Sequence, residues 1–273
     1  MVKKLLKHEL GSYIRILLPT NAIILIVAVV ARIIQFFESD TVAYNIIFWS
    51  SMLAVFVGIM ASMFMTIAVA VIRFYKNFFT AEGYLTFTLP VTPAQHITVK
   101  LLGAVIFELI SVGTALLSLI IISAGDVLVE VIKAAVYLIS QFFSNAGAEI
   151  ATNFVFYGIE MLILVAISGI FGVLVYYTCI SIGQMARKNR IFMAVLTYFG
   201  YYMLCQILST ILMVIFTVLE LSGVLEPIFI FFSNHELAGI HIILCTGIVL
   251  YTGLSLLFFF INKKIITKKL NLE

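Results

Sequence analysis

The chain has 273 residues, of which 63% are hydrophobic and 11% are charged, and its formal net charge is +3. Soluble proteins have roughly 45–50% apolar and about 25% charged residues. The composition therefore excludes an ordinary soluble protein. The function has to be sought at or across a membrane, and no nucleic-acid partner is expected.

Six stretches are long and apolar enough to cross a bilayer, because about 30 Å of hydrocarbon requires roughly 20 helical residues. No charged side chain lies between Asp40 and Arg73, within 161–186 or within 191–219. We therefore predict an all-α polytopic membrane protein with a single transmembrane domain over residues 1–273. The predicted spans are residues 16–37, 45–72, 96–122, 154–186, 191–219 and 237–261.

The first predicted element is an amphipathic helix that precedes the first span. Apolar residues recur there at helical spacing, and the lysines occupy the other face. Such a helix can lie in the membrane interface among anionic head groups. The alternative is a frayed basic tail that only sets the topology. The apolar set is Val2, Leu5, Leu6, Leu10 and Tyr13, and the polar set is Lys3, Lys4, Lys7 and His8.

The connection between the second and third spans is short and aromatic. It reads Phe-Phe-Thr-Ala-Glu-Gly-Tyr-Leu-Thr-Phe-Thr-Leu-Pro over residues 78–90. Gly83 is expected to break any continuous helix, and Pro90 is expected to end the extended run that follows. Thr92-Pro93-Ala94-Gln95 has the form of a capping box, so the next helix should start near Pro93. The aromatic rings pack either under the bundle and into the interface, or into a partner protein.

Two carboxylates lie inside predicted spans, where ionisable side chains are costly and are functional candidates. They are Glu108 in the third span and Glu160 near the outer end of the fourth. Each is either part of a polar pathway or a hydrogen-bonded glutamate that faces the interior of the bundle. Small residues are frequent in the fourth span and favour close helix packing. They are Gly158, Ala166, Ser168, Gly169, Gly172 and Gly183.

Three further connections have distinct patterns. Residues 126–144 form an amphipathic pattern with a narrow polar stripe, either an external interfacial helix or an extension of the third span. Residues 227–232 are apolar but too short to cross, which predicts a re-entrant or interfacial element. Arg187, Lys188 and Arg190 lie in a very short connection that is expected to be a tight helical hairpin. Their charges either contact a partner or only fix the topology.

Basic residues collect on alternate sides of the predicted spans. By the positive-inside rule, this distribution places both termini and the connections after the second and fourth spans in the cytoplasm. The clusters are Lys3, Lys4, Lys7 and Arg15; Arg73, Lys76 and Lys100; Arg187, Lys188 and Arg190; and Lys263, Lys264, Lys268 and Lys269.

Motifs for catalysis or cofactor binding are absent from the sequence. There is no phosphate-binding loop G-x-x-x-x-G-K-S/T, no H-E-x-x-H and no G-x-S-x-G. The four histidines are scattered, and all three cysteines lie in apolar spans, where a disulfide framework is not expected. We therefore expect no enzyme activity, cofactor or metal in this chain.

The segment at residues 73–91 resembles part of the six-span ABC transporter permeases of Gram-positive, clostridial-type bacteria. Its specific parts are Arg-Phe-Tyr-Lys-Asn-Phe-Phe at 73–79 and Glu-Gly-Tyr-Leu-Thr-Phe-Thr-Leu-Pro-Val at 82–91. Ile-Gly-Gln at 182–184 and the Lys-Lys-Leu-Asn-Leu-Glu ending at 268–273 are also similar. The resemblance implies the transmembrane subunit of an ATP-driven exporter in a bacterial plasma membrane.

In such an exporter, two six-span subunits pair, and each docks a separate ATPase chain. The resemblance implies that the segment between spans two and three acts as a coupling helix. It leaves open whether the pair is a homodimer or a heterodimer, and which substrate is moved, with a peptide or an antimicrobial compound as candidates. The candidate ATPase-coupling residues are Phe78, Phe79, Glu82, Gly83, Tyr84, Leu85, Phe87, Arg187, Lys188 and Arg190.

Two other classes of function remain. One is a membrane interaction protein without transport, such as an immunity or sensor protein. The other is a secondary transporter or an intramembrane enzyme, for which the sequence shows neither an internal repeat nor a polar constellation. An adjacent gene for a nucleotide-binding ATPase would favour the exporter.

Overall fold

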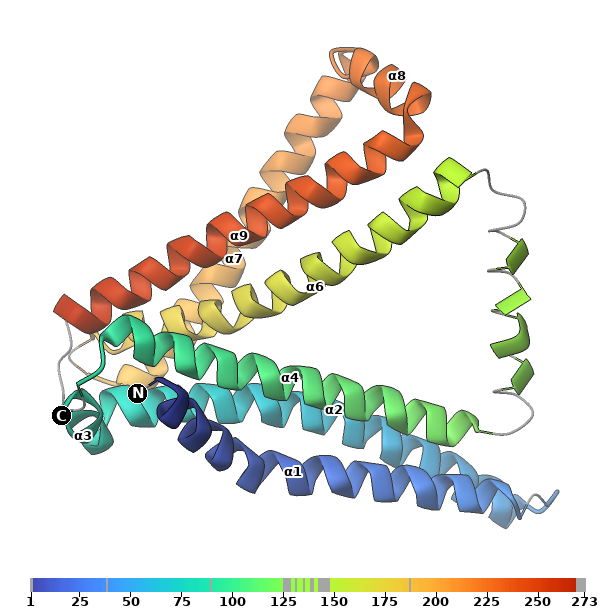
Figure 1. Ribbon diagram of the computed structural model, residues 1–273, viewed down its shortest axis with the longest axis horizontal. Helices are drawn as coiled ribbons and strands as arrows, with labels where there is room; N and C mark the ends of the chain where they lie inside the picture. Colours follow the sequence, from blue (N-terminus) through green and yellow to red (C-terminus); the bar gives the residue numbers. More distant parts are fainter. Residues whose placement is uncertain are drawn as a thin grey trace. The chain divides into compact units, whose positions relative to one another are not determined.

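The computed structural model describes residues 2–37, 39–88, 90–124, 148–186 and 188–268, together with parts of 129–141. Within these ranges the regular structure is entirely helical, and six helices are long and apolar enough to cross a membrane (Figure 1). This confirms an all-α polytopic membrane protein. The helices are α1 (Val2–Gln35), α2 (Val42–Phe79), α3 (Ala81–Thr88), α4 (Pro93–Ser123), α6 (Ala148–Gly183), α7 (Arg190–Leu221), α8 (Glu226–Asn234) and α9 (Glu236–Lys268).

The first helix joins two predicted elements. The amphipathic N-terminal helix and the first span form one continuous helix, α1, with Pro19 in its interior. A proline removes one backbone hydrogen bond from a helix. The hydroxyl of the next residue, Thr20, donates to the carbonyl of Leu17 at 2.8 Å. A backbone carbonyl beside the proline therefore has a side-chain hydrogen-bond partner.

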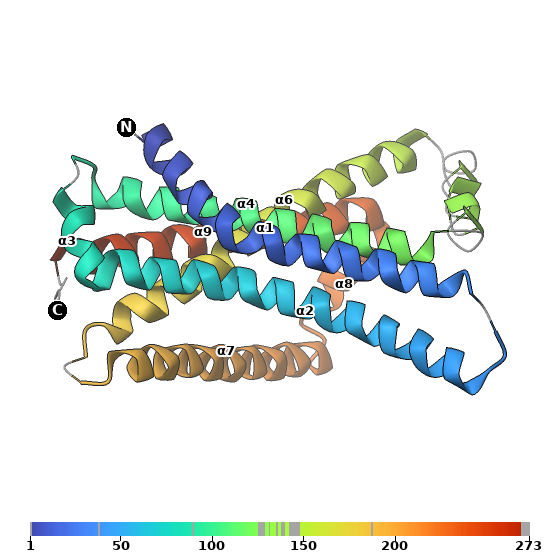
Figure 2. The same cartoon turned by 90° about the horizontal axis from the view of Figure 1, so that it is seen from below.

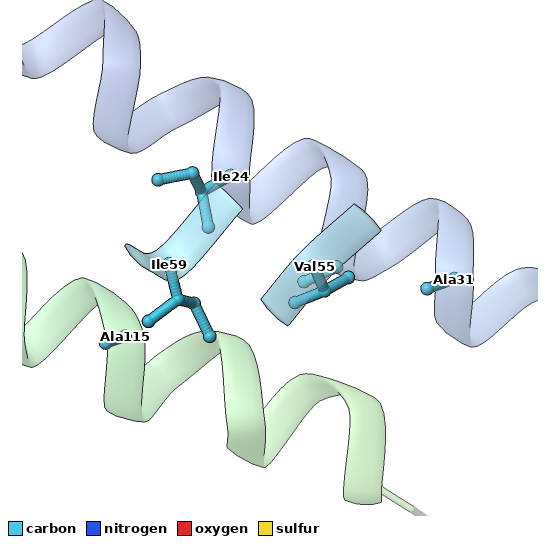
Figure 3. Packing of buried hydrophobic residues seen from close by; sticks show 6 residues of the cluster. Ile24, Ala31, Val55, Ile59 and Ala115 are labelled. Carbon is cyan, nitrogen blue, oxygen red and sulfur yellow. The ribbon is translucent and has the colours of Figure 1, made fainter. Parts of the chain in front are cut away.

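The chain divides into two compact units. Unit 1 comprises residues 1–77 and 85–144, and therefore contains α1, α4 and nearly all of α2. Within it, α1 and α4 run in the same direction and pack closely along each other (Figures 1 and 2). The apolar core of unit 1 is built from all three long helices: Ile24, Ala28 and Ala31 of α1, Val55 and Ile59 of α2, and Ala115 of α4 (Figure 3). The small alanines permit this close approach.

A buried hydrogen-bond network joins all three long helices of unit 1. The Asn21 amide on α1 donates to Ser111 Oγ on α4 at 3.4 Å, and it accepts from Ser62 Oγ on α2 at 2.6 Å. Thr66 Oγ1 on α2 lies 2.8 Å from Ser111 Oγ. Polar side chains between membrane-spanning helices hydrogen-bond to one another because lipid offers no alternative partner.

Unit 2 comprises residues 78–84 and 145–273. Its closest pair is α6 and α9, which are joined near one end by Asn262. The Asn262 amide donates to Thr178 Oγ1 and accepts from Ser181 Oγ, each at 2.7 Å. Helix α7 packs against α6 but buries none of its residues.

The turn between α6 and α7 confirms the expected tight hairpin. A Cβ atom on Gly183 would lie 2.5 Å from the backbone nitrogen of Ala194, so only glycine fits this crossing. Asn189 caps α7 in the left-handed conformation, with φ of 52°. Gly158 and Gly172, by contrast, have open space where a Cβ would lie, so these two glycines are not packed against another helix of this chain.

The segment before α4 differs from its prediction in one respect. Gly83 does not break the helix. The chain turns at Thr80 instead, and α3 continues through Gly83 to Thr88 where an extended run was expected. Glycine costs a helix only about 1 kcal/mol, which neighbouring contacts can offset. The capping box is confirmed, because Thr92 and Gln95 exchange both hydrogen bonds and Pro93 opens α4.

Two predicted outer elements have different outcomes. Much of 126–144 lies outside the described residues. The apolar patch at 227–232 lies in α8, a short helix with no buried residue. A re-entrant element would be shielded by protein, so the interfacial alternative fits α8 better.

Candidate functional site

An ion cluster joins α1, α2 and α4 at the end of unit 1 that carries the N-terminus. The Glu9 carboxylate receives two hydrogen bonds of 3.0 Å from the Arg73 guanidinium, one to each oxygen. The Lys100 ammonium lies 3.3 Å from both oxygens. Glu9 and Lys100 are only 5% and 4% exposed. One carboxylate therefore holds three helices together through two cations.

Local packing positions this cluster. A Cβ atom on Gly103 of α4 would lie 3.3 Å from both Glu9 Cγ and Tyr13 Cε2, so the glycine leaves room for α1. The buried Tyr13 ring stacks on Phe107, with the ring centroids 5.2 Å apart. The Arg73 guanidinium lies 5.2 Å from the centroid of the Tyr13 ring, at cation–π distance. The Tyr13 ring, which stacks on Phe107, thus packs against the Arg73 guanidinium.

Attraction between opposite charges stabilises the cluster. Arg73 and Lys100 contribute two positive charges and Glu9 contributes one negative charge. Charges in a poorly solvated environment interact more strongly than in water. The two cations therefore stabilise the ionised form of Glu9.

A cavity of about 350 Å³ adjoins the cluster. Helix α3 contributes Thr86 and Thr88 to its wall, and α4 contributes the buried His96 together with Lys100. Helix α3 therefore touches the same cavity as the ion cluster. The full lining is Leu5, His8, Glu9, Asn77, Thr86, Thr88, His96, Val99 and Lys100.

The candidate coupling residues differ in exposure. Phe78 and Phe79 are buried within the chain, at 0% and 3% exposed, so their rings are not surface anchors. Gly83 is also buried, whereas Glu82 and Lys188 are exposed and Tyr84 is 54% exposed. Arg190 is half-buried. Leu85 and Phe87 lie in α3, but their side chains, like the whole of Arg187, are outside the described part of the chain.

The two intramembrane carboxylates have different surroundings. Glu108 is half-buried on α4, and the described residues offer it no hydrogen bond or ion pair. Glu160 lies 2.8 Å from His241 Nδ1, and His241 Nε2 lies 3.1 Å from Asn153 Oδ1. This agrees with the interpretation of Glu160 as a hydrogen-bonded glutamate that links two helices, here α6 and α9.

Aromatic packing surrounds that second polar cluster. The Tyr157 ring centroid lies 4.4 Å from that of His241, and the Tyr157 hydroxyl donates to the carbonyl of Leu237 at 2.7 Å. No group of three metal-ligating side chains occurs among the described residues. The contacts of Tyr157, Glu160 and Asn153 with Leu237 and His241 connect α6 and α9.

Sequence reasoning missed Glu9, His96 and His241, and it treated Arg73 and Lys100 only as topology signals. A signal for Glu9 was present, because it lies four residues from both Leu5 and Tyr13 and therefore on the apolar face of α1. A charge on such a face predicts a buried partner. For His241, the partner Glu160 is 81 residues away, and no short motif connects them.

Comparison with protein-family models, curated proteins and solved structures found no match to this chain.

Proposed function

We propose that this protein is the transmembrane permease subunit of an ATP-driven ABC exporter and that a separate ATPase chain docks on helix α3. The observation that carries the proposal is the position of α3. It is a short helix between two spanning helices, it exposes Glu82 and Tyr84, and its second half lines the cavity beside the ion cluster. The resemblance of residues 73–91 to permease sequences supports the same assignment.

The contacts around α3 provide a route for coupling. A push on Tyr84 moves a helix whose Thr86 and Thr88 line the cavity, and the capped start of α4 follows four residues after Thr88. The cavity wall also includes Glu9 and Lys100, which connect α1 and α4. A movement of α3 therefore acts on α1 and α4, as a coupling element requires.

A second permease subunit fits the proposal, because a six-helix chain needs a partner to enclose a pathway. Helix α7 offers surface for such a partner or for lipid, since it buries no residue in the described chain. The mass of the complex in a lipid nanodisc tests this pairing. Two permease chains are expected, and full transport by a single chain would contradict the pairing.

The coupling assignment is tested by co-purification. The tagged protein is expected to retain a soluble ATPase with a phosphate-binding loop, and Tyr84→Ala combined with Phe87→Ala should weaken that retention by at least tenfold. Aromatic anchors at an interface each contribute on the order of 2 kcal/mol. The matched control is Phe36→Ala with Phe37→Ala, two exposed rings in the turn that follows α1. Equal retention by both double variants would end the assignment.

The proposal places the basic ends of both units in the cytoplasm of a bacterial cell, with α3 on that side. Cysteine labelling tests this in a background that lacks Cys179, Cys205 and Cys245. A membrane-impermeant reagent should label Ser39→Cys and should leave the exposed position Lys188→Cys unlabelled. External labelling of Lys188→Cys would reverse the topology.

A further inference from the structure

We propose that His241 and Glu160 form a proton-binding site between α6 and α9, and that proton uptake tightens the end of this helix pair where they lie. The ligand is a proton from water, and the group that accepts it is the His241 imidazole. The site uses neither α3 nor an ATPase, so it stands or falls separately from the exporter proposal.

The geometry of the ring is the first argument, because both ring nitrogens of His241 face oxygen atoms of α6. Nδ1 lies 2.8 Å from Glu160 Oε1, and Nε2 lies 3.1 Å from Asn153 Oδ1. Carboxylate and amide oxygens accept hydrogen bonds, and a neutral imidazole has only one N–H to donate. A protonated ring donates from both nitrogens and makes both contacts at once. A neutral ring keeps one of them, unless Asn153 turns its amide group.

The surroundings of the carboxylate are the second argument. The second oxygen of Glu160, Oε2, is buried and has no hydrogen-bond partner among the described residues. The side chain is 19% exposed, and within the described part of the chain its ion pair is with His241. A poorly hydrated carboxylate is costly unless a cation compensates its charge. A proton on His241 supplies that cation.

Two other titratable side chains touch the pair. Tyr157 of α6 lies against the His241 ring, with the ring centroids 4.4 Å apart, and Cys245 Sγ of α9 lies 3.9 Å from Glu160 Oε1. A phenol and a thiol are neutral or negatively charged, so neither can supply the compensating cation. The positive charge beside Glu160 therefore depends on His241.

The surrounding elements carry further titratable side chains near this end of the pair. None of those that the structure describes has a described contact with His241 or Glu160. They are Glu220 at the end of α7, and Glu226 and His235 on α8. The side chains of Glu149 on α6 and Glu236 on α9 lie outside the described part of the chain.

The opposite end of the α6–α9 pair is held by different chemistry. There Asn262 joins the helices through amide and hydroxyl groups, which do not change charge. Its partner Thr178 lies roughly five helical turns along α6 from Glu160. Beside the proton site, the Tyr157 hydroxyl still donates to the Leu237 carbonyl when the proton leaves. A rise in pH should therefore loosen one end of the pair while the other stays joined.

A double-variant cycle at two pH values tests the site. The full-length wild type, His241→Gln, Glu160→Gln and the double variant are unfolded with a harsh detergent at about pH 6 and at about pH 8.5, because a histidine changes charge near neutral pH. Coupling between the two residues should change the unfolding constant by at least about tenfold at the lower pH and by less than about threefold at the higher pH.

The matched control is His235→Gln, which removes an exposed histidine of the same unit. It should leave the pH dependence of unfolding within about twofold of the wild type. A loss of pH dependence in His235→Gln as large as in His241→Gln would assign it to surface charge and overturn the proposal.

Hydrogen exchange of the wild type covers the case in which His241→Gln does not fold. Backbone amides of residues 237–245 are compared with those of residues 258–266 in the same helix, after correction for the intrinsic exchange rate at each pH. Protection of the first segment relative to the second should rise at least about threefold from pH 8.5 to pH 6, because only the first lies at the proton site.

Two further results would overturn the proposal. One is a coupling that is equal or larger at the higher pH, together with relative protection that does not change, since the contact would then need no proton. The other is a Glu160→Gln protein with the stability and pH dependence of the wild type, since a neutral side chain would then serve as well as a carboxylate. Neither result bears on ATPase docking, which is measured on α3.

Discussion

In unit 1, each buried polar cluster draws side chains from all three long helices. Glu9, Arg73 and Lys100 form one such cluster, and the network around Asn21 forms the other. In unit 2, the corresponding clusters around Asn262 and His241 join only α6 and α9. None of the described contacts in these two clusters comes from the third helix, α7.

This difference identifies which helices are fixed by polar contacts. A buried polar group that loses its partner in an apolar environment costs several kcal/mol, so helices that share such contacts resist separation. Helix α7 crosses α6 closely at Gly183, and it also makes aromatic contacts, including Tyr176 stacked on Tyr198 with centroids 5.3 Å apart. We expect unit 1 to behave as one body and α7 to be the most separable spanning helix of unit 2.

The largest expected effect follows removal of the shared carboxylate in unit 1. Glu9→Gln leaves the buried Lys100 and the partly buried Arg73 without their common anion. Breaking a buried ion pair by removing one partner costs about 3–5 kcal/mol. Thermal unfolding in detergent, followed by the fraction that remains monodisperse on size-exclusion chromatography, should show a large loss of stability.

A double variant makes that prediction sharper. Glu9→Gln combined with Lys100→Met removes one of the two stranded cations and should recover part of the lost stability. The exposed carboxylate Glu226 provides the control, because Glu226→Gln should change little. A Glu9→Gln protein as stable as wild type would mean that the cluster does not hold unit 1 together.

The next effect concerns the single close crossing of α7. In Gly183→Ala, the new methyl group meets the backbone of Ala194, which cannot move aside as a side chain can. Overpacking of this kind costs about 1–3 kcal/mol. Gly172→Ala, in the same helix with open space around it, should be neutral or slightly stabilising. Equal stability of the two variants in an unfolding titration with a harsh detergent would contradict the packing of the hairpin.

A smaller loss of stability is expected when either asparagine network is removed. Asn21→Leu and Asn262→Leu each remove at least two side-chain hydrogen bonds. Such bonds average about 0.6 kcal/mol each between membrane helices, so each variant should lose about 1–2 kcal/mol. Because the two residues lie in different units, the losses should add to within about 0.5 kcal/mol in the double variant. Strong non-additivity would show that the units are energetically coupled.

The sequence was sufficient to predict what depends on local pattern. Span number and helix type follow from long apolar runs, and the start of α4 follows from Thr92 and Gln95, whose capping chemistry is complete within four residues. The tight turn after α6 was predicted from the shortness of the connection. These features need no knowledge of how the helices pack.

The polar clusters could not be predicted in the same way. Lys100 and Glu9 are 91 residues apart, and the sequence does not determine which helix faces which. Lys100 lies at the end of a span, and the sequence therefore indicated only a role in topology. The fold buries it. The glycines of the fourth span show the same limit, because only the packed structure separates Gly183, which meets Ala194, from Gly172, which meets open space.

The smallest expected effect is on the surface of α7. Leu212→Ala changes a side chain that is 65% exposed, and it should alter the stability of the isolated subunit by less than about 0.5 kcal/mol. Leu174→Ala in α6 changes a leucine that is 2% exposed and should cost about 2–5 kcal/mol. The two variants make the same chemical change in the least buried and the most buried spanning helix of unit 2. Their stabilities are compared by unfolding the dilute protein in detergent. If Leu212→Ala proves costly there, α7 packs against protein and is not the separable helix inferred above. If the cost emerges only when the chains are assembled in nanodiscs, α7 lies at the contact between two permease subunits, which would place the proposed pairing on this helix.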